Sequence, residues 1–391
     1  MIGVKVAHVA NLDYFIRHML LNQMSALQEA GYEVVVISSY GPHVPFIEEL
    51  GFRHITVATT RTLTPFADLV ALWHFYRVMR RERFTVVHTH NPKPNVLGQI
   101  AARLASVPVV VATVHGFYFH DNMRPALRRF YVIVDRLAGY CSDLFFSESS
   151  EDVATAIREK IVDARKIVHL GNGVDISTFN RQRFTQETRL RIRREFGIPE
   201  DAPVVGFIGR LVVEKGLLEL LQAAQLVVKE CPAVRFLIVG PDDPGRRDAV
   251  SPHRARDFGV QDNCIFAGWR KDTPELYASM DVFVLPSHRE GFPRSLIEAS
   301  ASSVPCVATQ IRGCREAVEH GRNGILVPKG DVAALAAALL GLLQNPTCSA
   351  RMGEEGRKMA VERFDERHVI GRVLSEYARL LAVKPDRRRR I

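Results

Sequence analysis

The stretch "DVFVLPSHREGFPRSLIEASA", residues 281–301, predicts a strand, a tight loop and a helix in immediate succession. Its first residues form an unbroken apolar run, which is typical of a strand buried on both faces of a parallel sheet. Pro293 suits the first turn of a helix, where a missing N–H costs little. Glu290 in the loop and Glu298 in the helix then lie near the carboxyl end of a strand, where α/β proteins bind their ligands.

The same alternation of strand and helix predicts two doubly wound α/β domains. The strand-like runs are "VKVAHVA", "EVVVISS", "TVVHTH", "VPVVVATVHG", "DLFFSES", "VVGFIGRL", "VRFLIVGP", "CIFAGW", "DVFVLPS", "VPCVAT" and "GILVP". A chain of 391 residues is also too long for one ordinary core. We expect Rossmann-like domains over residues 1–175 and 201–365, facing a central cleft and joined by a linker region over 176–200. A helix over 366–384 is expected to pack back on the first domain, and the basic tail 385–391 to be disordered.

Composition narrows the class of protein and its partners. The chain is 47% hydrophobic and 24% charged, with a net charge of +9. This excess suits anionic lipid, a nucleotide diphosphate or nucleic acid, but no recognition motif for nucleic acid accompanies it. The chain has no signal-peptide pattern and no apolar run long enough for a membrane span, so a cytoplasmic location is expected. Its six scattered cysteines form no C-x-x-C and are expected to be structural.

The stretch "GFIGRLVVEKG", residues 206–216, predicts a phosphate site. Gly209 lets the chain turn where a strand ends, and Arg210 and Lys215 follow at once. A guanidinium fork and a mobile ammonium together suit a diphosphate. A surface loop with solvated charges is the alternative. The P-loop pattern is absent, and so is G-x-G-x-x-G after the first strand, which argues against a dinucleotide dehydrogenase.

The helix that follows Pro293 offers a second phosphate contact. Its first turn is expected to leave free N–H groups near Arg294, Ser295 and Leu296, and the helix dipole favours an anion there. The alternative is a helix cap with solvated charges nearby.

Several motifs in order resemble the retaining nucleotide-sugar glycosyltransferases of glycogen-synthase-like family 4, which have the GT-B fold. The matching stretches are "TVHG" (113–116), "GNGVD" (171–175), "GRLVVEKG" (209–216), "EGFPRSLIEASA" with its E-x7-E signature (290–301) and "GRNGILVPKGD" (321–331). The resemblance covers nearly the whole chain. It implies that the first domain holds the acceptor and the second the donor, and that closure of the cleft assembles the site.

The resemblance also implies roles for individual residues. Arg210 and Lys215 would neutralise the leaving nucleoside diphosphate, and Glu290 would accept hydrogen bonds from hydroxyls of the donor sugar. Glu298 would hold the two ribose hydroxyls, for which a carboxylate has enough acceptor capacity. His115 would contact the donor sugar or phosphate without acting as a nucleophile. Further donor contacts are expected from Gly209, Gly240, Phe266, Gly268, Gly291, Phe292, Arg294, Ser295 and Leu296.

The first domain departs from the family pattern in its first loop, "ANLDYFIRH", which replaces the usual Gly-Gly. We expect Asp13 to be the N-cap of the following helix. Acceptor contacts are assigned to Asn11, Asp13, His90 and Lys93. This loop and "HTHNPKPNVLGQ" together resemble a capsular- and exopolysaccharide-assembly branch, which implies a UDP-sugar donor and an undecaprenyl-diphosphate-linked or polysaccharide acceptor. Alternatives are another GT-B enzyme, such as a nucleotide-sugar epimerase, or a GDP-sugar transferase with a soluble acceptor.

No cofactor and no metal are expected, because the chain has no D-x-D pair and cationic side chains with backbone amides can replace a metal's charge. Two basic stretches predict peripheral docking to an anionic membrane surface. They contain Arg77, Arg80 and Arg81 interleaved with Phe75, Tyr76 and Met79, and Arg124, Arg128 and Arg129 beside an apolar segment. The alternative is an ordinary amphipathic helix with its apolar face in the core.

Overall fold

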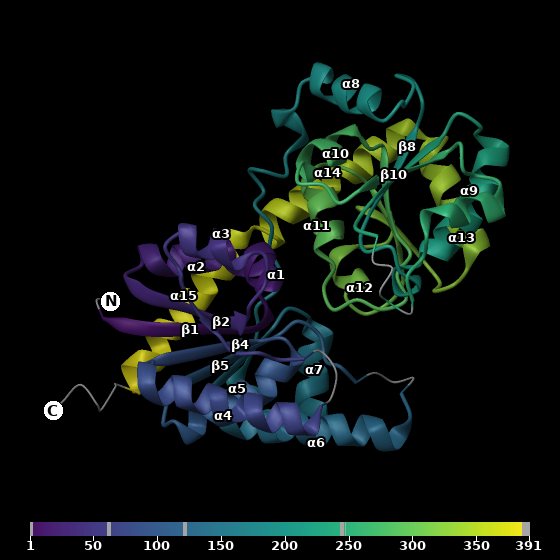
Figure 1. Cartoon of the computed structure of the whole chain (residues 1–391). Helices are drawn as coiled ribbons and strands as arrows, with labels where there is room; N and C mark the ends of the chain where they lie inside the picture. Colours follow the sequence, from purple (N-terminus) through teal and green to yellow (C-terminus); the bar gives the residue numbers. More distant parts are fainter. Residues whose placement is uncertain (1–2, 61–63, 120–122, 243–245, 247, 385–391) are drawn as a thin grey trace. The chain divides into compact units, whose positions relative to one another are not determined.

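The computed structural model shows two compact units, each built on one parallel sheet (Figure 1). The described residues are 3–60, 64–119, 123–242, 246 and 248–384. The first unit holds the chain up to Gly171 together with the residues from Ile370 onward, and the second runs from Asn172 to Val369. Residues 176–200, expected as a linker, are part of the second unit. The tail 385–391, expected to be disordered, lies outside the described residues.

The first unit contains a seven-stranded parallel sheet in the order β3-β2-β1-β4-β5-β6-β7. Its strands are β1 (Val4–Leu12), β2 (Tyr32–Ser39), β3 (Arg53–Thr56), β4 (Val86–His90), β5 (Val109–Val114), β6 (Leu144–Ser147) and β7 (Ile167–His169). Its helices are α1 (Asp13–Phe15), the π-helical η1 (Ile16–Leu20), α2 (Leu21–Glu29), α3 (Val44–Glu49), α4 (Pro65–Glu82), α5 (Pro92–Leu104), α6 (Pro125–Cys141), α7 (Ser150–Arg158) and the 3-10 turn η2 (Ala164–Lys166).

Helices cover both faces of this sheet, which explains why most of its buried strand residues are apolar. Figure 1 shows α4, α5 and α6 along one face, where Phe75 and Met79 enter the core. The other face is covered in part by the last helix, α15 (Glu366–Val383), whose Tyr377 is fully buried. The Tyr377 hydroxyl lies 2.7 Å from Nδ1 of His88 on β4.

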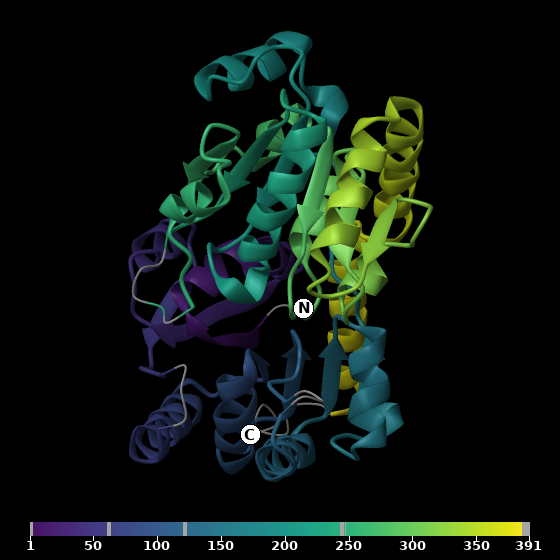
Figure 2. The same ribbon diagram turned by 90° about the vertical axis from the view of Figure 1, so that its right-hand side faces the viewer.

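The second unit contains a six-stranded parallel sheet in the order β10-β9-β8-β11-β12-β13. Its strands are β8 (Val204–Ile208), β9 (Arg235–Val239), β10 (Cys264–Gly268), β11 (Val282–Leu285), β12 (Cys306–Thr309) and β13 (Gly324–Val327). Its helices are η3 (Arg181–Arg183), α8 (Gln186–Glu195), η4 (Val213–Lys215), α9 (Leu217–Glu230), η5 (Pro252–Phe258), α10 (Thr273–Ser279), α11 (Arg294–Ala301), α12 (Cys314–Ala317), α13 (Val332–Leu343) and α14 (Pro346–Arg363). Figure 2 shows α9 along the near side of this sheet. The predicted fold class of two Rossmann-like doubly wound domains is confirmed.

In the described part of the chain, no single helix is both long and apolar enough to cross a membrane. Only α13 and α14 taken together meet that length and composition, and the chain bends by 98° between them.

The Tyr377 hydroxyl offers a test of how α15 is held. Tyr377→Phe should leave His88 Nδ1 buried without this partner, and should lower the free energy of unfolding by about 1–3 kcal/mol. Tyr140→Phe, at a side chain that is 88% exposed, is the control and should change it by less than about 0.5 kcal/mol. Urea unfolding followed by circular dichroism measures both. Equal midpoints for the two variants would contradict the role given to this hydrogen bond.

Candidate functional site

The loops after β8 and β11 meet where the strand order of the second sheet reverses. Such a switch point is where open α/β sheets bind ligands. Lys215 comes from the loop after β8 and Glu290 from the loop after β11, and Lys215 Nζ lies 2.5 Å from Glu290 Oε1. The Ser287 hydroxyl donates to the same carboxylate oxygen at 2.7 Å. The two side chains are 18% and 8% exposed, so the ion pair is largely shielded from water.

Two glycines allow these loops to approach each other closely. Gly216 has φ +73°, and a Cβ there would lie 2.0 Å from the Pro286 carbonyl oxygen. Gly313, with φ +78°, would place a Cβ 2.1 Å from the Gly291 carbonyl oxygen. Only glycine fits such positions without moving the backbone. The loops after β8 and β11 are also joined by a main-chain hydrogen bond, in which the His288 N–H donates to the Glu214 carbonyl at 2.8 Å.

Arg210 lies close in sequence to this pair but has a different partner. Its guanidinium is 3.6 Å from Glu214 Oε1, and both side chains are more than a third exposed. A pair this exposed contributes little to stability. Arg210 can therefore turn toward an anion at small cost.

Helix α11 begins one residue later than predicted. Pro293 is its N-cap in an extended conformation, and the first helical residue is Arg294. The expectation of a free N–H at Leu296 is wrong, because this group donates to the Pro293 carbonyl at 3.2 Å. The N–H of Ser295 has no partner among the described residues and still fits an anion contact.

Glu298 lies one turn into α11 beside two donors. The Tyr277 hydroxyl donates to its Oε2 at 3.0 Å, and Arg294 Nε is 3.8 Å from its Oε1. Burial raises the pKa of Glu298, while Arg294 and Tyr277 act in the opposite direction. The carboxylate keeps free acceptor capacity on Oε1, as binding of hydroxyl groups requires.

The remaining donor-site candidates lie at neighbouring strand ends. The Gly240 N–H donates to Gly268 O and the Gly209 N–H to Val239 O, both at 2.9 Å, which ties together the ends of β8, β9 and β10. Phe266 is a half-buried residue of β10, and Gly291 precedes Phe292 in the loop after β11. Phe292 is buried and packs edge-on against Phe364, so its side chain has a structural contact.

In the first unit, His115 follows β5 and is paired with a carboxylate that the sequence did not suggest. Its Nδ1 lies 2.8 Å from Glu148 Oε1, and Glu148 directly follows β6, the neighbouring strand. His115 Nε2 lies 3.4 Å from His90 Nδ1, and His90 Nε2 lies 3.0 Å from His8 Nδ1. Three imidazoles thus form one chain that ends at Glu148.

The carboxylate sets the direction of this chain. A carboxylate only accepts, so His115 Nδ1 carries a proton, and in the tautomer that has only this proton the Nε2 of His115 accepts from His90. His90 Nε2 then accepts from His8 Nδ1–H, which leaves His8 Nε2 without a proton. That atom is buried and has no hydrogen-bond partner among the described residues. Burial lowers the pKa of His8 to about 3 and holds the pKa of His90 well below its usual value, which keeps both neutral.

His8, His88 and His90 also form the group that comes nearest to a metal site. Their candidate ligand nitrogens lie within 4.8 Å of one another, and all three residues are buried. Both nitrogens of His88, however, are bonded to hydroxyls, of Tyr377 and Thr113, at 2.7 Å. Both nitrogens of His90 also have partners. The contacts therefore fit a hydrogen-bonded network better than a set of free ligands.

The residues assigned to the acceptor have partners within the first unit. Asp13 is the first helical residue, and Leu12 occupies the N-cap, so the expected cap is wrong. The Asp13 carboxylate instead accepts from the His43 N–H at 2.7 Å. Asn11 Oδ1 accepts from the Thr59 hydroxyl at 3.3 Å, and Lys93 Nζ lies 2.6 Å from Asp68. His90 is 1% exposed.

Two family models match the chain. A model described as glycosyl transferases group 1 matches residues 202–345, and one described as a glycosyl transferase 4-like domain matches residues 16–173. Together they cover every strand of the second sheet and every strand of the first except β1.

Similar proteins match along most of the chain. The chain is 28% identical to the UDP-Gal:alpha-D-GlcNAc-diphosphoundecaprenol alpha-1,3-galactosyltransferase of Escherichia coli, over 86% of this chain and 87% of that enzyme. It is 24% identical to the capsular polysaccharide biosynthesis glycosyltransferase CapM of Staphylococcus aureus, over 95% and 96%. The structure of Anabaena HepE in complex with UDP and glucose matches with a TM-score of 0.83 at 20% identity, over 96% of this chain and all of that one.

The direction of the histidine chain can be read directly by NMR. With ring-¹⁵N histidine, we expect His90 and His8 to be neutral tautomers protonated at Nδ1, and His115 to carry a proton at Nδ1. Glu148→Leu should remove the acceptor and let His115 populate the Nε2–H tautomer. Glu49→Gln, at an exposed residue of the same unit, is the control and should leave the spectrum unchanged. A wild-type His115 protonated only at Nε2 would contradict the inferred direction.

Proposed function

This chain belongs to the group 1 glycosyltransferases of the GT-B fold, and from that premise we propose that it transfers a sugar with retention from a UDP-sugar to a lipid-linked or polysaccharide acceptor. The acceptor carries its reactive hydroxyl on a saccharide attached to undecaprenyl diphosphate or to a growing surface glycan. The E. coli relative, whose name states both a UDP-galactose donor and an undecaprenyl-diphosphate-linked acceptor, supports this choice. So does the capsular relative.

The Lys215–Glu290 ion pair is the observation that carries the proposal. In a nucleotide-sugar, the anomeric carbon is bonded directly to a phosphate oxygen, so an anion and a set of hydroxyls lie side by side. A cation and a carboxylate 2.5 Å apart match that junction. When the donor enters, Lys215 turns to the phosphate and Glu290 accepts from the sugar hydroxyls. Each charge exchanges one partner for another and none is left buried alone.

The reaction needs charge stabilisation more than it needs a nucleophile. The bond between the anomeric carbon and the phosphate oxygen breaks, and a bond to the acceptor hydroxyl oxygen forms on the same face. The acceptor proton passes to the leaving phosphate. Arg210, Lys215 and the N–H of Ser295 stabilise the charge that develops on the diphosphate. The proposal therefore assigns no step to a metal or a cofactor, and Glu298 holds the ribose.

The outer side of α4 and α6 suits a membrane location for such an acceptor. Two of the three side chains predicted to interleave with the arginines of α4, Phe75 and Met79, are instead buried in the core. A different set of apolar side chains on the two helices is exposed: Phe66, Leu69, Val70, Trp73, Leu127, Phe130, Ile133, Leu137 and Tyr140. Phe66 is 87% exposed and Trp73 is 56% exposed. Figure 1 shows the two helices on the same face of the sheet, with α5 in contact with both.

This set, the α4–α6 face, also carries positive charge. Exposed arginines are Arg77, Arg80 and Arg81 on α4, Arg129 on α6 and Arg124 at the N-cap of α6. Apolar side chains that enter the headgroup region beside arginines are the pattern of a helix that lies on an anionic bilayer. We place the enzyme on the cytoplasmic face of the membrane, peripherally bound through the first unit.

The ion pair can be tested with variants that keep side-chain size. Lys215→Met and Glu290→Gln should each lower kcat by about a hundredfold or more, as loss of one preorganised charge contact does. The assay is release of UDP or GDP from a panel of nucleotide-sugars with a saccharide-lipid acceptor. Lys229→Met, at an exposed residue near the end of α9, is the matched control and should keep full activity.

The double variant separates a structural role from a functional one. Each single variant leaves one shielded charge without its partner, which lowers stability. Lys215→Met combined with Glu290→Gln removes both charges, so the melting temperature should recover while kcat stays low. If activity recovers together with stability, the pair is a structural contact and the donor assignment fails.

Vesicle binding tests the α4–α6 face. Phe66→Ser and Trp73→Ser should each weaken binding to phosphatidylglycerol vesicles by about tenfold, because one large apolar side chain contributes roughly 1.5–3 kcal/mol on burial. Trp269→Ser, at a side chain of the second unit that is 45% exposed, is the control. Co-sedimentation measures the bound fraction. Unchanged binding in both α4 variants, or equal binding to zwitterionic phosphatidylcholine, would refute the docking surface.

A further inference from the structure

A pocket in the second unit lies away from the candidate donor site. Its volume is about 410 Å³, within the range of small-molecule sites. Pro203, Val282 and Pro305 line it, at the amino ends of β8, β11 and β12. Because these parallel strands carry Lys215 and Glu290 beyond their carboxyl ends, the pocket opens at the opposite edge of the sheet. With four or five residues per strand, the two edges are roughly 15 Å apart.

One arginine of this pocket is part of the fold. Arg193 is 6% exposed and donates through Nη1 to the carbonyls of Pro199, Glu200 and Ala202. Its Nη2 lies 3.3 Å from Asp281 Oδ2, which also accepts from the Val204 N–H at 2.9 Å. These bonds hold the connection from α8 to the start of β8. The Asp281 carboxylate is thereby already engaged.

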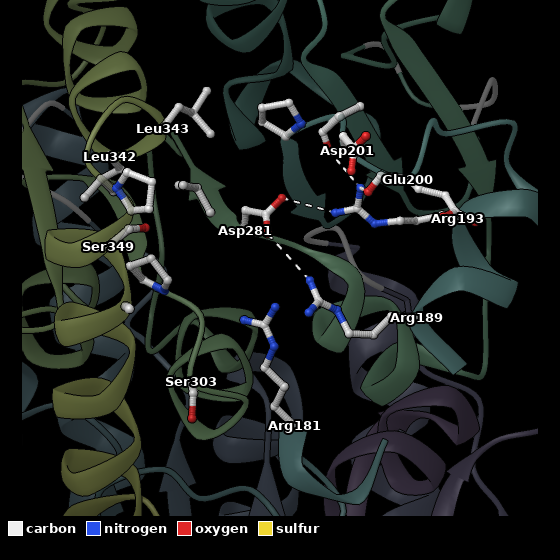
Figure 3. A pocket seen from close by; sticks show the side chains of 16 residues that line it. Arg181, Arg189, Arg193, Glu200, Asp201, Asp281, Ser303, Leu342, Leu343 and Ser349 are labelled. Atoms are coloured by element: carbon white, nitrogen blue, oxygen red, sulfur yellow. Dashed lines mark hydrogen bonds and ion pairs between the residues drawn. The ribbon is translucent and has the colours of Figure 1, made fainter. Parts of the chain in front are cut away.

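Two further arginines point into the same pocket without a full partner (Figure 3). Arg189 Nη2 is 3.7 Å from Asp281 Oδ1, beyond hydrogen-bond distance, and Arg189 Nε is buried with no partner among the described residues. No carboxylate of the described chain forms an ion pair with Arg181, and Figure 3 shows its guanidinium directed toward Asp281 and Arg189. Burial, and then the charge of Arg189, lowers the pKa of Arg181. Two guanidiniums held close together with only Asp281 as a shared counter-charge disfavour the folded state.

The other acidic residues at the pocket do not supply that counter-charge. Glu200 Oε1 is 3.4 Å from Arg194, which lies outside the lining. Asp201 is exposed to water. An anion between Arg181 and Arg189 would therefore contact two positively charged side chains. Their nearby counter-charge is the Asp281 carboxylate, which is already bonded to Arg193.

The wall opposite the arginines is mostly apolar. It is formed by α13 and α14 through Leu342, Leu343, Pro346 and Ala350, with the Ser349 hydroxyl as a polar group (Figure 3). We propose that this pocket binds a small phosphate monoester, with its phosphoryl oxygens between Arg181 and Arg189 and its carbon skeleton against α13 and α14. Guanidinium forks match phosphoryl oxygens in pairs, and Arg189 Nε gains the acceptor that it lacks. The bound ester would link α8 to α14.

Binding is tested with two probes on the full chain, inorganic phosphate and phenyl phosphate, against sodium chloride at equal ionic strength. Both probes should raise the melting temperature saturably, and phenyl phosphate should bind more tightly because its ring reaches the apolar wall. Arg181→Met and Arg189→Gln should each weaken binding at least tenfold. Arg191→Met, at an exposed residue of the same helix α8, is the control of equal charge and should bind as the wild type does.

Variants of the candidate donor site, at the carboxyl edge of the same sheet (the donor edge), show which of the two sites binds the phosphate. Lys215→Met should still be stabilised by phosphate but no longer by UDP. Arg181→Met and Arg189→Gln should lose stabilisation by phosphate and keep stabilisation by UDP. Their response to UDP also shows that these two variants fold. Phosphate binding that is lost in Lys215→Met and kept in both arginine variants would overturn the proposal, because the anion would then bind at the donor edge. A melting temperature that rises without saturation would overturn it as well. Neither result depends on whether the chain transfers a sugar.

Discussion

Burial of parallel strands on both faces is the constraint on which the rest of the molecule depends. Strands such as β5, β8 and β11 lie between two layers of helices, so their interiors must be apolar and charged groups are confined to the strand ends. The carboxyl ends bring Lys215 and Glu290 together, and the amino ends bring the arginines of the second pocket to Asp281. The second sheet thus has two separate polar edges, and the loops at each edge are positioned by the strands that they follow or precede.

The first sheet contains an exception that follows the same rule. His8 and His88 lie inside β1 and β4 and occupy paired positions of neighbouring strands. Polar groups this deep persist when they bond to one another, and here they do so through His90 and the hydroxyls of Tyr377 and Thr113. The same network orients His115 at the sheet edge. The hydrogen-bonded chain thereby connects His8 in the core to His115, which is a candidate ligand contact at the edge of the sheet.

The sequence predicted the elements well and the pairings poorly. Apolar runs and helical periodicity identify both domains, because burial imposes those patterns directly. They do not state which loops touch, so the bond between Lys215 and Glu290, 75 residues apart, could not be read from either motif. Glu148 was missed although it follows a strand next to that of His115. The alternation in "HTH" (residues 88–90) indicates that His88 and His90 lie on one face of a strand. Phe75 and Met79 were misplaced because the helical face toward the core depends on the neighbouring helix.

The contact between Gly216 and the Pro286 carbonyl bears on how the donor site responds to a ligand. Gly216 lets the two loops come this close, and the His288 N–H donates to the Glu214 carbonyl at 2.8 Å, so loop motion that separates Lys215 from Glu290 would have to break a main-chain hydrogen bond. Rearrangement on binding is then confined to side-chain torsions, and little conformational entropy remains to be lost there. The second unit should accordingly recognise a nucleotide as a rigid template, with its selectivity already present before the ligand arrives.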